Sequence, residues 1–276
     1  MEARSDMRFV MLGSGAVRDN VRRAGPSQAL FVDGETWVFD CGRSACTNLA
    51  RAGIPCETVD RVLLTHLHFD HVVDLPYLVY VGWVKERAAR LQVYGPQGTK
   101  DFVERIIRPP FEQDIKSRLG HGKDLGTLDP EVTDLEAGNS LLAAGDSRLS
   151  AISMTHANMP TLAFRVDSGD RRVVVTGDGI PGEGFSDFCR GADLLVIECS
   201  GTAEFLAEQP WGSWHMTPPG IASVAQELDV KKVMIKHLVM EDITGDRTAP
   251  YRMADQIRER YNGEVIVGED LLELDI

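Results

Sequence analysis

The chain has 276 residues, of which 43% are hydrophobic and 26% are charged, a composition typical of a folded globular protein. No segment approaches 18 consecutive apolar residues, which excludes an ordinary membrane-spanning helix. Acidic residues outnumber basic ones 42 to 29, for a net charge of −13, so nucleic acid is an unlikely partner while a small anionic substrate stays open.

The first third of the chain is expected to form strands separated by tight turns. Strands are expected at residues 8–12, 29–32, 36–39 and 59–64, and a helix at residues 44–52. Asp33-Gly34 lies between the second and third of these strands and is a strong hairpin signal. The strand at 59–64 leads directly into the sequence T-H-L-H-F-D-H at residues 65–71.

A second strand-rich block with helices makes up the rest of the chain. Further helices are expected at residues 74–90, 97–107, 218–228 and 250–261, and strands at 91–94, 149–154, 161–166, 173–176, 194–197, 232–235 and 264–267. Residues 108–130 are rich in Pro, Gly and charge without clean periodicity, so we expect a long loop or insertion there. No Pro/Ser-rich linker divides the two blocks. The sequence therefore predicts one α/β domain over residues 1–276, with two packed sheets and helices outside them.

The cysteines indicate a reducing compartment. There are five of them, an odd number, and none forms a C-x-x-C pair: Cys41, Cys46, Cys56, Cys189 and Cys199. Free thiols are typical of proteins in reducing compartments, so we expect a cytoplasmic protein.

Four potential metal ligands are crowded into T-H-L-H-F-D-H: His66, His68, Asp70 and His71. Alternate residues of an extended segment share a face, so His66 and His68 could point together at one ion. Asp70 and His71 begin the next turn and could face a second ion. Imidazole and carboxylate ligands suit zinc and are open to manganese or iron.

Three further candidate ligands follow the ends of separate expected strands. His156 follows the strand at 149–154, Asp178 follows the strand at 173–176 within the turn T-G-D-G, and His237 follows the strand at 232–235. On its own Asp178 could be a simple turn residue. Together the three predict sheets whose strands converge on one site.

These motifs resemble the metallo-β-lactamase fold superfamily. T-H-L-H-F-D-H is similar to its H-x-H-x-D-H signature, and His156, Asp178 and His237 match its later metal motifs in order and approximate spacing. The resemblance implies an αββα sandwich of two mixed β-sheets with a dinuclear metal site along one edge. It assigns His66, His68 and His156 to one ion, Asp70, His71 and His237 to the other, and Asp178 to a bridge between them. Two Zn²⁺ ions are implied, with Mn²⁺ or Fe possible.

His215 is expected to serve the substrate. It lies in H-M-T-P-P just before the helix at 218–228, with Thr217 as a plausible N-cap and Pro218 at the first helical position. H-M-T-P, followed by that helix and K-H-L, is similar to the ribonuclease Z, small-phosphodiesterase and arylsulfatase-like branch of the superfamily. There the equivalent histidine serves the transferred or leaving group. A histidine near neutral pKa can donate a proton to a departing alkoxide, although a capping or surface role is the alternative.

The resemblance implies a hydrolase in which a metal-bridging hydroxide attacks a small ester, with a phosphodiester as the preferred substrate. It places Asp70 and His215 in the catalytic machinery. A homodimer is a possible assembly. An arylsulfate, carboxylic ester or lactone is the alternative. A transfer-RNA 3′-processing endonuclease is the second alternative. Such nucleases usually carry a long, basic arm that binds the transfer RNA, and no segment of this chain is both long and basic enough to be that arm. Two alternatives lie outside the hydrolases. One is an iron-dependent oxygenase or redox protein, and the other is a metal-binding protein with an inactive site.

The sequence leaves three other polar or aromatic features open. His121 has no motif match and lies either in an exposed loop or at the pocket mouth, where it could contact substrate. Trp83, Trp211 and Trp214 either belong to the core or line that mouth. Asp40, in F-D-C-G, is expected to orient a ligand histidine through a hydrogen bond rather than to bind metal itself.

Overall fold

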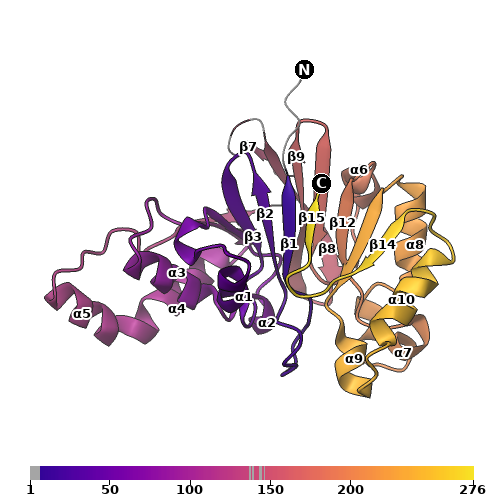
Figure 1. Cartoon of the computed structure of the whole chain (residues 1–276), viewed down its shortest axis with the longest axis horizontal. Helices are drawn as coiled ribbons and strands as arrows, with labels where there is room; N and C mark the ends of the chain where they lie inside the picture. Colours follow the sequence, from indigo (N-terminus) through magenta and orange to yellow (C-terminus); the bar gives the residue numbers. More distant parts are fainter. Residues whose placement is uncertain (1–6, 137, 139, 143–144, 146) are drawn as a thin grey trace.

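Two β-sheets pack face to face, and helices cover the outer face of each (Figure 1). The computed structural model describes residues 7–136, 138, 140–142, 145 and 147–276. The first sheet has the strand order β15-β1-β2-β3-β4-β5-β6, and the second has the order β11-β8-β9-β10-β12-β13-β14, with β7 paired to β8. The predicted αββα sandwich is confirmed. None of the described helices is long and apolar enough to cross a membrane.

The N-terminal half builds most of the first sheet and its helical layer. Its strands are β1 (Arg8–Gly13), β2 (Ser27–Val32), β3 (Glu35–Phe39), β4 (Arg61–Leu63), β5 (Gln92–Pro96) and β6 (Glu131–Leu135), and the C-terminal strand β15 (Glu273–Asp275) pairs with β1. The helical segments are α1 (Ala45–Arg51), η1 (Cys56–Thr58), α2 (Phe69–Val72), α3 (Leu75–Val84), α4 (Thr99–Ile107), η2 (Pro109–Phe111) and α5 (Glu112–Gly120). The expected hairpin joins β2 to β3, and Asp33 and Gly34 supply the two positive φ angles of its turn, 49° and 81°.

The C-terminal half builds the second sheet and its helical layer. Its strands are β7 (Ser140–Leu142), β8 (Arg148–His156), β9 (Met159–Ser168), β10 (Arg171–Thr176), β11 (Ile180–Pro181), β12 (Leu194–Glu198), β13 (Lys232–Lys236) and β14 (Glu264–Val267). The helical segments are α6 (Phe185–Cys189), α7 (Ala203–Ala207), η3 (Gly212–Trp214), α8 (Pro218–Glu227), α9 (Val239–Thr244) and α10 (Ala249–Arg258). Thr217 caps α8 as expected, because its hydroxyl accepts a hydrogen bond of 3.2 Å from the backbone N–H of Gly220.

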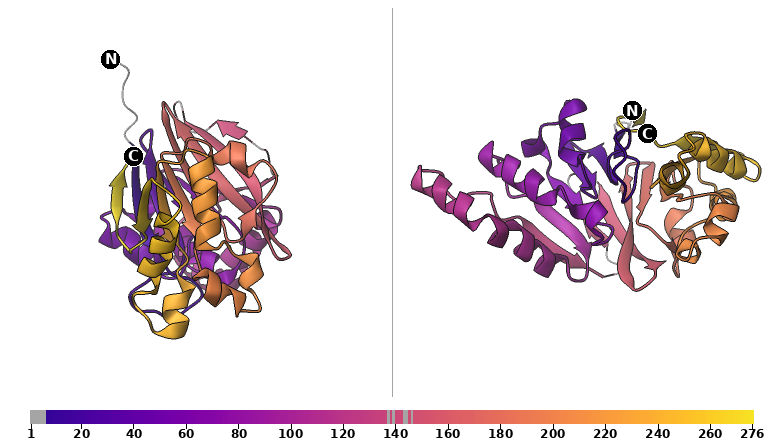
Figure 2. Two further views of the ribbon diagram at one scale, coloured as in Figure 1. Left: turned by 90° about the vertical axis from the view of Figure 1, so that its right-hand side faces the viewer. Right: turned by 90° about the horizontal axis from the view of Figure 1, so that it is seen from below.

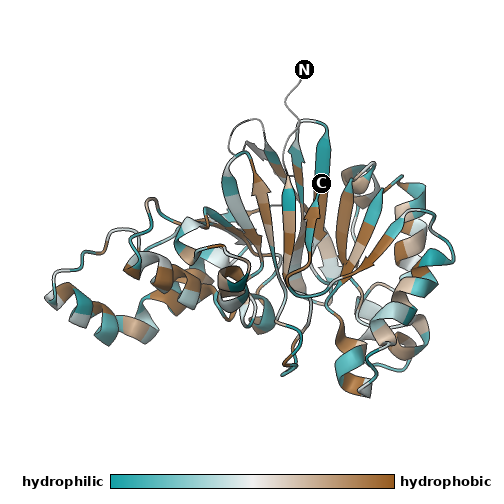
Figure 3. Ribbon diagram, viewed as in Figure 1, coloured by the Kyte–Doolittle hydropathy of each residue, from teal (hydrophilic) through white to brown (hydrophobic). Residues whose placement is uncertain are grey.

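Three apolar clusters hold the four layers together. Figure 2 shows the layers from two further sides. Large side chains from both sheets, including Phe9, Trp37, Phe39 and Phe164, fill the space between the sheets. One outer cluster joins the first sheet to α1, α3 and α4, and the other joins the second sheet to α8 and α10. The strands of both sheets are accordingly hydrophobic over much of their length (Figure 3). Burial on both sides fixes the strand positions, and with them the loops at the strand ends.

The expected helix at residues 74–90 is shorter than predicted. Helix α3 ends at Val84, Glu86 adopts a positive φ of 61°, and the backbone N–H of Arg87 bonds to the carbonyl of Gly82 at 2.8 Å. The guanidinium of Arg87 is buried, and it donates hydrogen bonds to the carbonyls of Val59 and Cys56. Satisfying those carbonyls draws residue 87 inward, so the helix cannot continue.

The long loop expected at residues 108–130 contains helical structure. The helical segments there are η2 and α5, and α5 projects away from the sandwich (Figure 1). Ile115 is the one buried residue of α5, so the helix has almost no apolar periodicity to detect. Ion pairs at i,i+4 spacing support it instead, from Glu112 to Lys116 and from Asp114 to Arg118.

Candidate metal centre

Strands of both sheets end at one edge of the sandwich and bring the predicted ligands together. Strands β3 and β4 run parallel in the first sheet, and β10, β12 and β13 run parallel in the second. Parallel strands present their carboxyl ends at the same edge, which is where ligand-binding loops gather in α/β folds. The loops after these strands, the short helix α2 and the end of β8 carry all seven predicted ligands: His66, His68, Asp70, His71, His156, Asp178 and His237.

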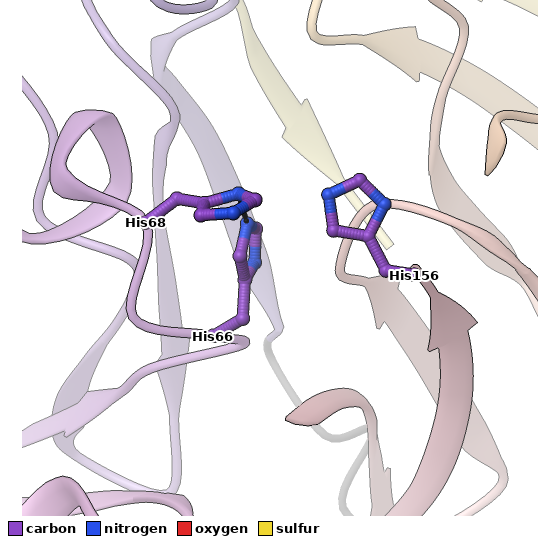
Figure 4. Close-up of side chains that lie close together, drawn as sticks. All are labelled: His66, His68 and His156. Atoms are coloured by element: carbon purple, nitrogen blue, oxygen red, sulfur yellow. Dashed lines mark hydrogen bonds between the residues drawn. The ribbon is translucent and has the colours of Figure 1, made fainter. Parts of the chain in front are cut away.

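One group of ligand atoms consists of three imidazoles. His66 and His68 project from the loop after β4, and His156 faces them from the end of β8 (Figure 4). His66 Nε2 lies 3.0 Å from His68 Nδ1, and the ring centroid of His156 lies 5.3 Å from that of His66 and 5.1 Å from that of His68. One nitrogen from each ring lies within 4.8 Å of the others, close enough to share one ion.

The second group joins Asp70, His71 and His237, whose ligand atoms also lie within 4.8 Å of one another. Asp178 lies between the two groups. Its Oδ2 atom is 3.0 Å from His237 Nε2, 3.4 Å from His71 Nε2 and 3.8 Å from His66 Nε2. A carboxylate within reach of ligands from both groups has the position that a bridging ligand requires.

The chemistry of these side chains fits a pair of cations. Among the described side chains, His71 Nε2, His156 Nδ1 and Asp178 Oδ1 are buried and have no hydrogen-bond partner, a costly state that a bound cation relieves. The carboxylates also draw positive charge into the site. Burial lowers the pKa of His71, but the charges of Asp40 and Asp178 outweigh burial and raise this pKa to about 9. In the same way, Asp178 and Asp70 outweigh burial at His237 and raise its pKa to about 10.

A buried carboxylate fixes the orientation of one ligand, as expected from the sequence. Asp40 follows β3 with a positive φ of 55°, and its Oδ2 lies 2.8 Å from His71 Nδ1. Its Oδ1 accepts a hydrogen bond of 2.7 Å from the backbone N–H of Thr65. This contact leaves His71 Nε2 free to face an ion, the arrangement that outer carboxylates commonly impose on ligand histidines.

His215 lies beside the ligands without joining either group. Its ring centroid is 5.2 Å from that of His156, and its Nδ1 is 3.2 Å from Glu198 Oε1. Burial lowers the pKa of His215, but the charge and hydrogen bond of Glu198 outweigh it, so the pKa is raised. Sequence reasoning missed Glu198, although a carboxylate at the end of the buried segment L-L-V-I-E gives the same kind of signal as Asp178.

A cavity of about 220 Å³ opens above these residues. It is lined by Val17, Arg18, His68, Asp70, His156, Asp178, Trp211, Trp214, His215, His237 and Val239. His121 is not brought to this site. It follows α5 on the surface, where its Nδ1 lies 2.7 Å from the carbonyl of Ser117. Trp83 is also elsewhere: it is a buried residue of α3, and its indole N–H donates a hydrogen bond to the carbonyl of Asp124.

Comparison with known proteins agrees with the geometry. The family model described as "Beta-lactamase superfamily domain" matches residues 35–238. The chain is 34% identical to the ribonuclease Z of Mycobacterium bovis (strain BCG / Pasteur 1173P2) over 280 residues, covering 98% of each chain. The chain belongs to the metallo-β-lactamase superfamily, in its ribonuclease Z branch. As a member, it is a metal-dependent hydrolase acting on ester bonds.

Solved structures of this superfamily share the fold across the whole chain. The YhfI protein of Bacillus subtilis superimposes with a TM-score of 0.80 at 19% identity, covering 99% of this chain and 100% of its own. The short form of human tRNase Z has a TM-score of 0.74 at 23% identity, covering 97% of this chain and 98% of its own.

The expectation that nucleic acid is an unlikely partner conflicts with the names of these relatives. It rested on the net charge of −13, which sums the whole surface. Substrate binding depends on the local electrostatic potential rather than on the net charge. In this chain the cation Arg18 borders the cavity, although acidic residues are in excess overall.

Proposed function

We propose that this protein hydrolyses phosphodiester bonds with a dinuclear metal centre, and that zinc is its metal. His66, His68 and His156 would hold one ion, Asp70, His71 and His237 the other, and Asp178 would bridge them. Two divalent ions in these positions lower the pKa of a water molecule and withdraw charge from the oxygens of a phosphoryl group. The names of the relatives support a phosphodiester over a sulfate or carboxylic ester.

The observation that carries this proposal is the pair formed by His215 and Glu198 beside the ligand cluster. Glu198 is fully buried, and its Oε1 also accepts a hydrogen bond of 2.9 Å from the backbone N–H of Met216. This fixes the carboxylate, which in turn holds the imidazole and favours its protonated form. His215 can then donate its proton to the alkoxide that leaves when a phosphodiester is cut.

Cleavage of an RNA 3′ end is the second candidate, because the curated relative bears the name ribonuclease Z. A small phosphodiester is the first choice, because the β8–β10 segment between His156 and Asp178 holds only two tight connections and offers no long arm for a large RNA. The two candidates are separated by comparing two substrates: a transfer-RNA precursor that has a 3′ trailer, and a dinucleotide.

The test is a set of chromogenic esters with one leaving group, given to zinc-loaded protein: a phosphodiester, a phosphomonoester, a sulfate, a carboxylic ester and a lactone. We expect preference for the phosphodiester, kept in the matched control His121→Ala, whose imidazole lies on the surface just after α5. The effect of His215→Ala depends on the leaving group and is expected to be small for an activated one. Preference for the sulfate or carboxylic ester would overturn the substrate class. Iron in place of zinc, with no turnover, would favour the redox alternative.

A further inference from the structure

The loop between α7 and α8 places an exposed tryptophan beside the metal centre. Trp211 and Trp214 both line the cavity of about 220 Å³ above the ligands, yet their environments differ. Trp211 packs edge-on against His215, with ring centroids 5.2 Å apart, and against Phe205 at 6.2 Å. Trp214 has no such contact with a ring of the described residues, and 46% of it is exposed. An indole left open at a catalytic cavity offers a flat apolar surface to a ligand.

The position of Trp214 is fixed by its own loop. Gly212 begins the turn η3, and a side chain there would place its Cβ 1.8 Å from the carbonyl oxygen of Leu206, so only glycine fits. The backbone N–H of Trp214 bonds to the carbonyl of Trp211 at 3.1 Å, and that of His215 bonds to the carbonyl of Gly212 at 3.2 Å. The exposed indole is therefore held next to the histidine proposed to serve the leaving group.

A cation from a separate loop borders the same cavity. Arg18, in the β1–β2 loop, makes no side-chain hydrogen bond or ion pair with the part of the chain that the structure describes, apart from a longer-range attraction to Asp242. It also borders a second cavity of about 370 Å³, which shares Val17, Arg18 and Asp70 with the first and continues toward Arg43 and Phe69. The groove thus extends past the metal centre, with a guanidinium at the junction.

We propose that Trp214 is a stacking platform for a nucleobase next to the scissile phosphate, and that Arg18 contacts a phosphate oxygen of the same substrate. The substrates are then phosphodiesters of nucleosides. Aromatic stacking suits any base, because every base has a flat π-face, and a guanidinium suits phosphate. This inference rests on the proposed phosphodiesterase function and adds the class of substrate.

The test compares two zinc-dependent reactions with one leaving group: a nucleoside 5′-(p-nitrophenyl phosphate) and methyl p-nitrophenyl phosphate. Loss of one stacking contact is worth about 5- to 150-fold, so Trp214→Ala should lower the ratio of kcat/KM for the nucleoside ester to that for the methyl ester by this factor. Trp214→Phe should retain most of the ratio. Phe111→Ala, which removes an exposed aromatic ring near α5, should leave the ratio unchanged.

An equal loss on both esters in Trp214→Ala would overturn the proposal, since it would mean that Trp214 stacks on the nitrophenyl group or only supports the loop. Absence of turnover with either ester would contradict the phosphodiesterase function instead. Calorimetric binding of a nucleoside monophosphate then decides the inference separately. Weaker binding in Trp214→Ala than in Trp214→Phe would support the platform, and equal binding in the two variants would overturn it.

Discussion

The ammonium of Lys236 lies 3.8 Å from Asp40 Oδ2, and both side chains are fully buried. The nitrogen has no hydrogen-bond partner among the described residues, so the attraction to Asp40 is its main compensation. Asp40 in turn holds His71 through a contact of 2.8 Å. The three residues form a line in which a buried cation neutralises the carboxylate that orients a predicted ligand.

Lys236→Met should therefore destabilise the protein, because it removes one of the charges that compensate the buried carboxylate of Asp40, which among the described residues keeps only its contacts with His71 and Thr65. Removing one partner of a buried ion pair costs about 3–5 kcal/mol. We expect a loss of this size in the free energy of unfolding of the metal-free protein, measured in urea. The double variant Lys236→Met/Asp40→Asn should lose less than the sum of the two single variants, because the buried charge is then gone. Additive losses would show that the pair does not interact.

Asp178→Ala should remove at least one of two ions and most of the activity. Its Oδ2 lies within 3.0–3.8 Å of His237, His71 and His66, so no other described carboxylate reaches both ligand groups in this way. Metal per chain after dialysis, measured by mass spectrometry, gives the result directly. Retention of two ions per chain would remove Asp178 from its proposed bridging role, and His121→Ala serves as the control.

His215→Ala should keep both ions and lose turnover in a way that depends on the leaving group. A proton donor contributes about 10²–10⁴-fold when the leaving group is a strongly basic alkoxide, and much less for p-nitrophenolate. We expect the slope of log kcat against leaving-group pKa to become steeper in this variant. Glu198→Gln, which keeps the size of the residue that holds His215 Nδ1 at 3.2 Å, should change the slope in the same direction but less. An unchanged slope with lost metal would exclude the proton-donor role.

Chelation should lower the thermal midpoint of the protein, because the predicted ligands come from loops of both sheets. A ligand that binds only the folded state stabilises it by about 4 kcal/mol at a free concentration of 1,000 times its Kd. Differential scanning fluorimetry with zinc and with a chelator measures the effect, and Asp178→Ala should show a smaller difference. An identical midpoint with and without zinc would mean that the ions do not link the two sheets.

The predicted ligands stand out in the sequence because most of them follow a strand whose apolar residues are plain. His66 and His68 follow the buried residues of β4, and Asp178 and His237 follow β10 and β13. Burial in a two-sided sheet leaves a strong apolar signal, and the polar residue that ends it stands out. The same reasoning explains why the fold class could be predicted.

The residues that sequence reasoning missed depend on contacts between distant segments. Lys236 has the pattern of a surface residue before His237, and only the tertiary fold brings its ammonium within 3.8 Å of Asp40 Oδ2. Helix α5 was missed because ion pairs rather than apolar spacing support it. His121 stayed ambiguous for the same reason, since its place at the end of α5 depends on a helix that apolar periodicity does not reveal.

The division of the predicted ligands between the two sheets also sets the order in which they become available while the chain is being synthesised. His66, His68, Asp70 and His71 emerge from the ribosome with the first sheet, whereas His237 follows β13, near the end of the second. Contacts between such distant segments form late in folding because the intervening chain must first be ordered. A nascent chain therefore presents only part of the predicted ligand set at first, and the full set comes together only after β13 has joined its sheet.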